Sequence, residues 1–293
     1  MALAKSTGEG VVDPASRAQS TLHLALGNRG VLWGGSLLVA MVLIAAIGPY
    51  FTVDATALNP IQRLKPSSAE VWFGSDFLGR DVFARVVAGA RISLAVGVAV
   101  AVMSVAIGLL LGMVAGYLRA LDAPIMRVMD GLMSIPGILL AIALVSLSGA
   151  TLMTVIVAIV VPEIPRVVRL VRSVVLTVRE EPYVEAAIAA GTRTHLIMSR
   201  HILPNTIAPL IVQATYICGS AMLLEAILGF LGAGIPPEIP SWGNIMSEGR
   251  TYFQISPWII FYPGIALAMT VLAVNVMGDG LRDTLDPRIA RKM

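Results

Sequence analysis

The residue types that perform catalysis are few in this chain and do not form a known catalytic set. A nucleotide-binding P-loop needs a Gly-Lys-Ser/Thr step, yet the only lysines are Lys5, Lys65 and Lys292, and none of them follows a glycine. No Gly-x-Ser-x-Gly, His-Glu-x-x-His or Cys-x-x-Cys motif occurs, and the three histidines are too scattered to ligate a metal without help. The sequence therefore excludes ATP hydrolysis through a P-loop and argues against an enzyme.

Two carboxylates lie within apolar stretches, where a charge is costly and is often functional. Glu225 lies in residues 206–231, and two roles stay open for it: contact with a substrate, or packing through a pair with an arginine or a backbone group. Glu163 lies between two prolines, and we expect it to hold a kinked helix to its neighbours or to Arg166. Glu225 is the candidate for the substrate pathway.

Residues 183–205 form a mildly amphipathic segment between two much more apolar ones. The segment reads Glu-Ala-Ala at 185–187, then three residues and Gly191. This predicts two short helices that meet at the glycine, because glycine tolerates the positive φ of a tight turn. Alanines leave one helix face nearly bare, and Pro204 allows a new helix to start. The segment is either a docking surface for another protein or a connector that folds against the chain's own helices.

The elements that must position these residues are membrane helices. The chain of 293 residues is 57% hydrophobic and 13% charged, which is too apolar for an ordinary soluble domain. A single cysteine excludes an intrachain disulfide, and a net charge of +3 gives no reason to expect nucleic acid as a partner. We expect six helical crossings: 31–51, 93–117, 131–148, 152–161, 206–231 and 257–277. The fourth is expected to be kinked and to leave the membrane near Arg166.

The distribution of Lys and Arg sets the orientation. With the N-terminus in the cytoplasm, fifteen of the 21 Lys and Arg residues fall in cytoplasmic segments, as the positive-inside rule predicts. The division of the chain is then a cytoplasmic leader, a first helix, an extracytoplasmic loop, a transmembrane core and a cytoplasmic tail: 1–30, 31–51, 52–91, 92–280 and 281–293. Within the loop, residues 74–94 are expected to include a short helix along the membrane surface. The 183–205 segment falls in the cytoplasm.

The segment 183–205 resembles the EAA loop of bacterial ABC-importer permeases, whose pattern is EAA-x3-G-x9-I-x-LP. Every fixed position matches except one, where His201 replaces the usual Ile, and HILPN at 201–205 is similar to the dipeptide/oligopeptide/nickel branch. Further motifs of the C-type subunit of that branch follow in the same order over residues 30–290: FGSD at 73–76, LGRDV at 78–82, GARISL at 89–94, FLG at 230–232, PSWG at 240–243, GDGLRD at 278–283 and LDPR at 285–288.

The resemblance implies a fold and a mechanism. The fold is an all-α, six-helix type I ABC-importer transmembrane domain, whose EAA loop docks as a coupling helix in a cleft of an ATPase subunit. Closure of two ATPases around ATP then swings the permease pair from inward-open to outward-open. The residues that the resemblance assigns to ATPase coupling are Glu185, Ala186, Ala187, Gly191, His201, Leu203 and Pro204. The chain itself would bind no cofactor or metal, because ATP and Mg belong to the partner ATPase subunits.

The resemblance also implies partners and a cargo. The partners are a homologous B-type permease subunit, two ATP-binding subunits, an extracytoplasmic solute-binding protein and the lipid bilayer of the bacterial cytoplasmic (inner) membrane. The expected cargo is a di- or oligopeptide, and nickel, glutathione or an oligosaccharide is the alternative within the family. A secondary transporter driven by ions is the rival from another class; it would carry more midplane charges, whereas Glu225 stands nearly alone. A membrane enzyme fails for want of a catalytic constellation.

Overall fold

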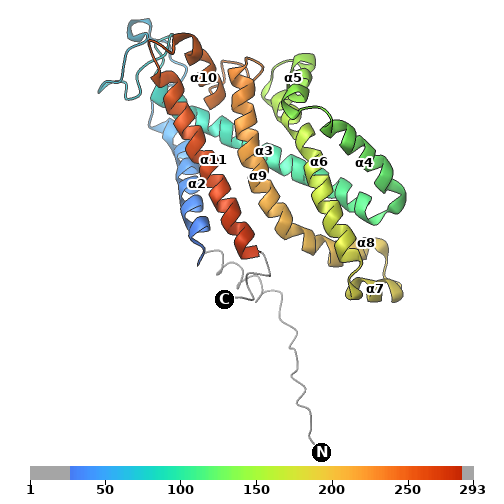
Figure 1. Ribbon diagram of the computed structural model, residues 1–293. Coiled ribbons are helices and arrows are strands. Elements are labelled where there is room, and N and C mark those ends of the chain that lie inside the picture. Colours follow the sequence, from blue (N-terminus) through green and yellow to red (C-terminus); the bar gives the residue numbers. More distant parts are fainter. Residues whose placement is uncertain (1–26, 286–293) are drawn as a thin grey trace, which may run out of the picture.

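The computed structural model of the protein describes residues 27–285 as a set of packed helices (Figure 1). Within those residues no strand forms, and the one β contact is an isolated bridge between Ser75 and Asp81. The all-α fold expected from the sequence is confirmed. Most of the expected leader and tail lies outside the described residues. The long helices are α2 (Arg29–Ile47), α3 (Val82–Tyr117), α4 (Arg119–Met133), α5 (Gly137–Ser148), α6 (Leu152–Arg179), α9 (Leu203–Phe230) and α11 (Trp258–Leu285).

Shorter helical elements connect the long ones. Four of them matter for the sites below: α7 (Pro182–Ala189), α8 (Thr194–Ile197), the π-helix η3 (Met198–Ile202) and α10 (Trp242–Gly249). The remaining three are single 3₁₀ turns: η1 (Gly48–Tyr50), η2 (Pro60–Gln62) and η4 (Arg250–Tyr252). In Figure 1, α7 and α8 lie at one end of the bundle, and α10 with the 52–81 segment lies at the other.

Four helical stretches of the described chain are long and apolar enough to cross a membrane: Arg29–Tyr50, Val82–Tyr117, Thr194–Phe230 and Trp258–Leu285. The helices α4 and α5 would make a fifth, broken crossing if they are counted together, because the chain bends by 88° between them. The helix α6 has 28 residues but carries Glu163 and four arginines, and it continues through both of its prolines without a break. The number of six crossings therefore stays a prediction.

The sequence predicts the third crossing as one helix, 131–148, and this prediction is wrong. The helix α4 ends at Met133 and α5 begins at Gly137. Pro136 lies in between, and a proline disfavours the helical conformation of the residue before it and donates no backbone hydrogen bond. The apolar run is therefore divided between two helices that meet at a corner.

The sequence also predicts a separate surface helix within 74–94, and this prediction is wrong as well. The helix α3 runs without a break from Val82 to Tyr117, so its first turns belong to the same helix as the second crossing. Asp81 caps this helix by accepting a hydrogen bond from Phe83 N at 2.8 Å. Burial raises the pKa of the Asp81 carboxyl above its usual value, against the lowering effect of the backbone N–H groups.

Residues 74–81 form a compact turn that a buried ion-pair cluster holds against α10. Asp76 Oδ2 lies 2.6 Å from Arg80 Nε and 2.7 Å from Arg85 Nη1, and Glu248 of α10 binds the same two guanidinium groups. Gly79 adopts a φ of +76°, and a Cβ there would lie 1.7 Å from a backbone oxygen, so the turn requires glycine. The FGSD and LGRDV motifs therefore build a fixed structure at the end of the bundle opposite α7.

Candidate functional site

The segment 183–205 forms α7, a tight turn and α8, so two short helices meet at a glycine as predicted. The helix α7 ends in a Schellman motif, in which Gly191 N donates to Ile188 O at 2.9 Å and Thr192 N donates to Ala187 O at 3.1 Å. Gly191 has a φ of +74°, but a Cβ there would meet nothing within 4 Å. Glycine is therefore required here by the positive φ of the backbone and not by a lack of space for a side chain.

Apolar side chains on the inner side of this loop anchor it to the bundle. Val184 of α7, Ile197 of α8 and Ile202 of η3 are buried in one core cluster with Val175 and Val178 of α6. Burying each such side chain contributes roughly 1.5–3 kcal/mol. A displacement of α7 would therefore be transmitted to α6 and α9, because the loop has no loosely packed hinge of its own at these positions.

The outer face of α7 is exposed. Glu185 and Ala186 are exposed and Ala187 is half-buried, while Tyr183 and Ile188 present apolar side chains that are 46% and 48% exposed. Small side chains allow another backbone to approach closely, and Glu185 lies in the first turn, where a negative charge is stabilised by the helix dipole. This combination is typical of a helix that docks in a groove of another protein.

Tyr183 and His201 join the two arms of the loop. Their rings lie 6.1 Å apart, and the Tyr183 hydroxyl accepts a hydrogen bond from Asn205 Nδ2 at 3.3 Å. Asn205 Nδ2 also donates to His201 O at 2.6 Å. The histidine that departs from the general EAA pattern thus lies on η3 and faces Tyr183 of α7.

The sequence predicts that a new helix can start at Pro204, and α9 does begin at Leu203, with Pro204 in its first turn. One helical stretch runs from Thr194 through η3 and into α9. Its π-turn brings Leu203 N to Met198 O, five residues back. A π-turn adds one residue to the helical repeat, which makes room for a proline that lacks an N–H and would clash with the preceding turn of an α-helix. Leu203 and Pro204 therefore lie at the junction where η3 passes directly into α9.

Glu225 lies apart from this loop and is completely buried among α3, α9 and α10. Ser93 Oγ donates to Glu225 Oε2 at 3.4 Å and accepts a hydrogen bond from Trp242 N at 3.3 Å. Among the described residues, Glu225 Oε2 thus has a serine hydroxyl as its partner and not an arginine, and Glu225 Oε1 is buried without a hydrogen-bond partner. The cavity that Leu223 and Ile227 of α9 line does not include Glu225. The geometry favours a packing role over contact with a substrate.

Glu163 lies on the wall of a cavity of about 440 Å³, where the corner between α4 and α5 faces α6 and α9. Arg166 lines the same cavity, and its Nη1 lies 3.4 Å from Glu163 Oε2, so the expected contact between these two residues is present. Tyr216 and Ser220 of α9 line the opposite side.

Residues 104–291 match the model of a protein family described as the binding-protein-dependent transport system inner membrane component. The chain belongs to this family. The probable peptide ABC transporter permease protein y4tQ of Sinorhizobium fredii is 52% identical over 292 residues, which is the full length of both chains. The dipeptide transport system permease protein DppC of Alkalihalophilus pseudofirmus is 43% identical and covers 89% of this chain and 87% of its own. The di/tripeptide permease protein DppC of Pseudomonas aeruginosa is 40% identical, with 89% of each chain covered.

A similar fold is found among solved structures. The MetNI methionine ABC transporter in an inward-facing conformation matches with a TM-score of 0.56, over 70% of this chain and 97% of that chain. Because the identity is 22%, this match shows the fold alone. It agrees with an importer-type transmembrane component made of helices.

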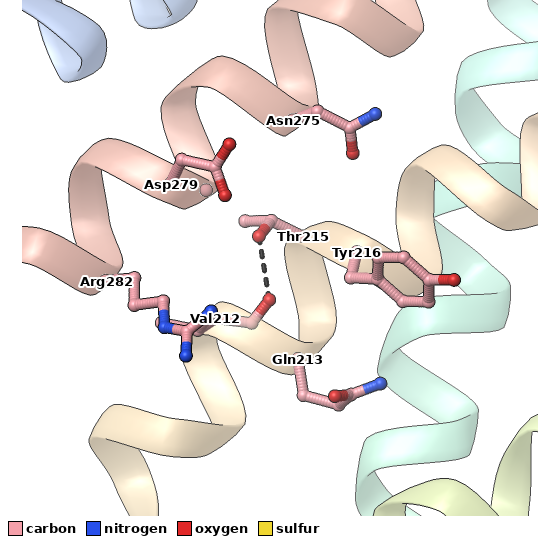
Figure 2. Close-up of a pocket in the computed structure, with 8 residues that line it drawn as sticks. Val212, Gln213, Thr215, Tyr216, Asn275, Asp279 and Arg282 are labelled. Atoms are coloured by element: carbon pink, nitrogen blue, oxygen red, sulfur yellow. Dashed lines mark hydrogen bonds between the residues drawn. The ribbon is translucent and has the colours of Figure 1, made fainter.

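Polar residues of α9 and α11 line cavities of this permease that sequence reasoning missed. Tyr216 lines both the 440 Å³ cavity and a smaller one of about 190 Å³, to which Asn275, Asp279 and Arg282 of α11 also contribute (Figure 2). A spacing signal was present, because Gln213, Tyr216 and Ser220 follow one another at intervals of three and four residues, which places them on one helix face. The mean hydropathy of residues 206–231 conceals this polar face, because most residues of the segment are apolar.

Proposed function

We propose that this chain is one of two permease subunits of an ATP-driven importer for di- or oligopeptides, and that the second is a homologous B-type permease. Two further subunits hold ATP with Mg, and an extracytoplasmic binding protein delivers the cargo. The relatives support this proposal, since proteins at 40–52% identity are named for peptide, dipeptide or di/tripeptide transport.

The exposed face of α7 is the observation that carries the proposal. Glu185 and the small residues Ala186 and Ala187 face outward on a helix whose inner side is locked into the core. We place an ATPase subunit on this face, with Gly191 fixing the end of α7. His201, Leu203 and Pro204 would then pass its movement to α9, because η3 continues directly into that helix. A loop that only connected two membrane helices would need no such exposed, rigidly supported face.

The proposed location is the bacterial cytoplasmic membrane, with both termini and the α7 end of the bundle in the cytoplasm. Fifteen of the 21 Lys and Arg residues support this orientation. So does the arrangement in Figure 1, where the first residues of α2 and the last of α11 lie at the same end as α7. The binding protein would approach the opposite end, at the 52–91 loop and α10.

Uptake by proteoliposomes that contain the full complex tests the proposed function. We expect accumulation of a labelled di- or tripeptide only when ATP, both ATPase subunits and the binding protein are present. Nickel, glutathione and an oligosaccharide serve as alternative cargoes in parallel assays. Accumulation driven by a proton or sodium gradient without ATP would refute the proposal in favour of a secondary transporter. ATP-dependent uptake of another cargo alone would refute its peptide assignment.

A further inference from the structure

Three arginines follow one another along α6 at intervals of three residues, but they are held differently. Arg169 and Arg172 donate to aspartates of α4 at 2.5–2.6 Å. Among residues 27–285, Arg166 has no such partner, and its guanidinium comes only within 3.4 Å of Glu163. Its side chain is 48% exposed, whereas that of Glu163 is 9% exposed. One arginine of the row is therefore loosely held beside a nearly buried carboxylate.

A buried carboxylate is costly unless it is well paired and hydrogen-bonded. Within the described residues, Glu163 has hydrogen-bond contacts only with Arg166 Nη1, at 3.4 and 3.5 Å, which is the long limit of such a bond. Each group therefore forms only weak hydrogen bonds with the other in this arrangement. Ionisable residues at membrane depth often mark a pathway for a ligand or an ion, and Glu163, unlike Glu225, also lines a cavity.

Both charged groups open onto the 440 Å³ cavity. This volume lies within the range of about 300–1,000 Å³ that is usual for small-molecule sites. Apolar residues such as Leu223 and Ile227 line much of the remaining wall, and Tyr216 places its ring 6.0 Å from the Arg166 guanidinium. The cavity therefore offers one anion, one cation and an apolar surface within a few ångströms of each other.

We propose that this cavity is a cargo site for a zwitterionic ligand, in which Glu163 binds an ammonium group and Arg166 binds a carboxylate. The inference rests on the proposed function, because a short peptide has both groups at its ends and an apolar or polar body between them. Arg166 would exchange its long contact with Glu163 for a bidentate contact with the ligand, a geometry for which guanidinium is suited.

Two further cavities lie beside α9, and lining residues are shared from one cavity to the next. Tyr216 is shared with the 190 Å³ cavity, and Gln213 and Arg282 are shared between that cavity and a third one of about 650 Å³ that reaches Asn205. Figure 2 shows Asn275, Asp279 and Arg282 of α11 beside the α9 residues of this stretch. Polar groups therefore line the face of α9 between the cargo site and the coupling loop.

Competition binding to the complete complex, without the binding protein, tests this site. The probe is a tripeptide with free termini and a central photoreactive side chain, and the competitors are trialanine, N-acetyl-trialanine and trialanine amide. We expect labelling of α9 near Leu223 and Ile227, and we expect trialanine to compete about tenfold better than either blocked peptide. In Glu163→Gln the advantage over N-acetyl-trialanine should vanish, and in Arg166→Gln the advantage over trialanine amide should vanish.

Arg169→Gln is the matched control, since Arg169 lies on the same helix, binds Asp130 at 2.6 Å and does not line the cavity. It should keep both preferences. Arg166→Lys retains the positive charge, so it separates the effect of losing that charge from misfolding. It should preserve part of the preference for trialanine over trialanine amide. If wild-type complex takes up peptide with ATP but Glu163→Gln and Arg166→Gln keep both preferences, the cargo site is refuted and the proposed function stands. If wild-type complex takes up no peptide, the proposed function itself fails.

Discussion

Gly112 of α3 lies directly against Val171 of α6, so that a Cβ built on the glycine would be 2.6 Å from the valine Cβ and 2.9 Å from Val168 O. Gly108 and Gly116, one turn away on either side, meet valines of α6 in the same way. In membrane helices, small residues allow backbones to approach and gain van der Waals contacts. Because α6 leads directly into α7, this seam connects the 183–205 loop to the centre of the bundle.

Gly112→Ala should loosen the seam between α3 and α6. The added methyl group has no space, and overpacking of this kind costs about 1–3 kcal/mol. We expect a lower thermal unfolding temperature of the purified complex, and partial recovery in Gly112→Ala/Val171→Gly, where the opposing Cβ is removed. Gly35→Ala is the control, because a Cβ at Gly35 meets nothing within 4 Å. Equal destabilisation by both single variants would contradict the close contact.

Substitutions of Gly191 should rank by their tolerance of positive φ. Alanine in this conformation costs roughly 1–2 kcal/mol, and asparagine costs less because it adopts the left-handed region more readily. Proline can neither adopt φ +74° nor donate the hydrogen bond to Ile188 O. Peptide uptake and ATPase association should therefore fall in the order Asn, Ala, Pro, while all three proteins still insert. Normal uptake and association in Gly191→Pro would disprove a coupling role for this turn.

Glu185→Gln should weaken docking of the ATPase subunit and uncouple ATP hydrolysis from uptake. The change keeps the shape of an exposed side chain and removes its charge, so a lost charge-assisted hydrogen bond should reduce affinity by about tenfold. Titration of the ATPase subunit against the permease pair measures this effect. Glu181→Gln is the matched control, since Glu181 is exposed at the start of α7 and makes no capping bond. A similar loss in both variants would indicate a general effect of charge.

The sequence predicts the coupling loop well because its structure is set locally. Gly191, with alanines before it, specifies a helix end through one backbone conformation, and no distant residue is needed to form it. The apolar crossings can also be predicted. Lipid surrounds these helices, so apolar residues cover all of their faces and form long runs that are easy to recognise in the sequence. Asp81 could have been recognised as a helix cap, which would have placed the start of α3 correctly.

Other features depend on contacts that no local pattern contains. The π-turn before Pro204 is a solution of backbone geometry, and the 88° corner at Pro136 is set by the packing of α4 and α5 on neighbouring helices. The cavity beside Glu163 exists only because α6 and α9 meet there. The serine partner of Glu225 is 132 positions away in the chain, so sequence reasoning left its role open.

Glu225→Gln should leave the concentration dependence of peptide uptake unchanged. Glutamine keeps an oxygen that accepts the Ser93 hydrogen bond, and residue 225 does not line the cavity of α9. Glu225→Leu should lower the unfolding temperature instead, because the buried Ser93 hydroxyl then loses an acceptor at a cost of about 1–3 kcal/mol. A marked rise in the peptide concentration for half-maximal uptake in Glu225→Gln would return Glu225 to the substrate pathway.

Glu248→Gln should destabilise the end of the bundle opposite α7. Glu248 and Asp76 together neutralise Arg80 and Arg85, and Arg85 is only 1% exposed. Removing one carboxylate leaves a buried guanidinium without full compensation, which costs about 3–5 kcal/mol. We expect a lower unfolding temperature and faster proteolysis within the 52–81 segment.

Glu238→Gln is the control for this prediction, because Glu238 is an exposed glutamate in the connection between α9 and α10. It should leave both measurements unchanged. Glu248→Gln/Arg80→Gln removes one charge of each sign, so it should recover part of the lost stability if charge imbalance is the cause. Failure of the double variant to recover any stability would show that hydrogen-bond geometry, and not charge, holds the turn at 74–81 against α10.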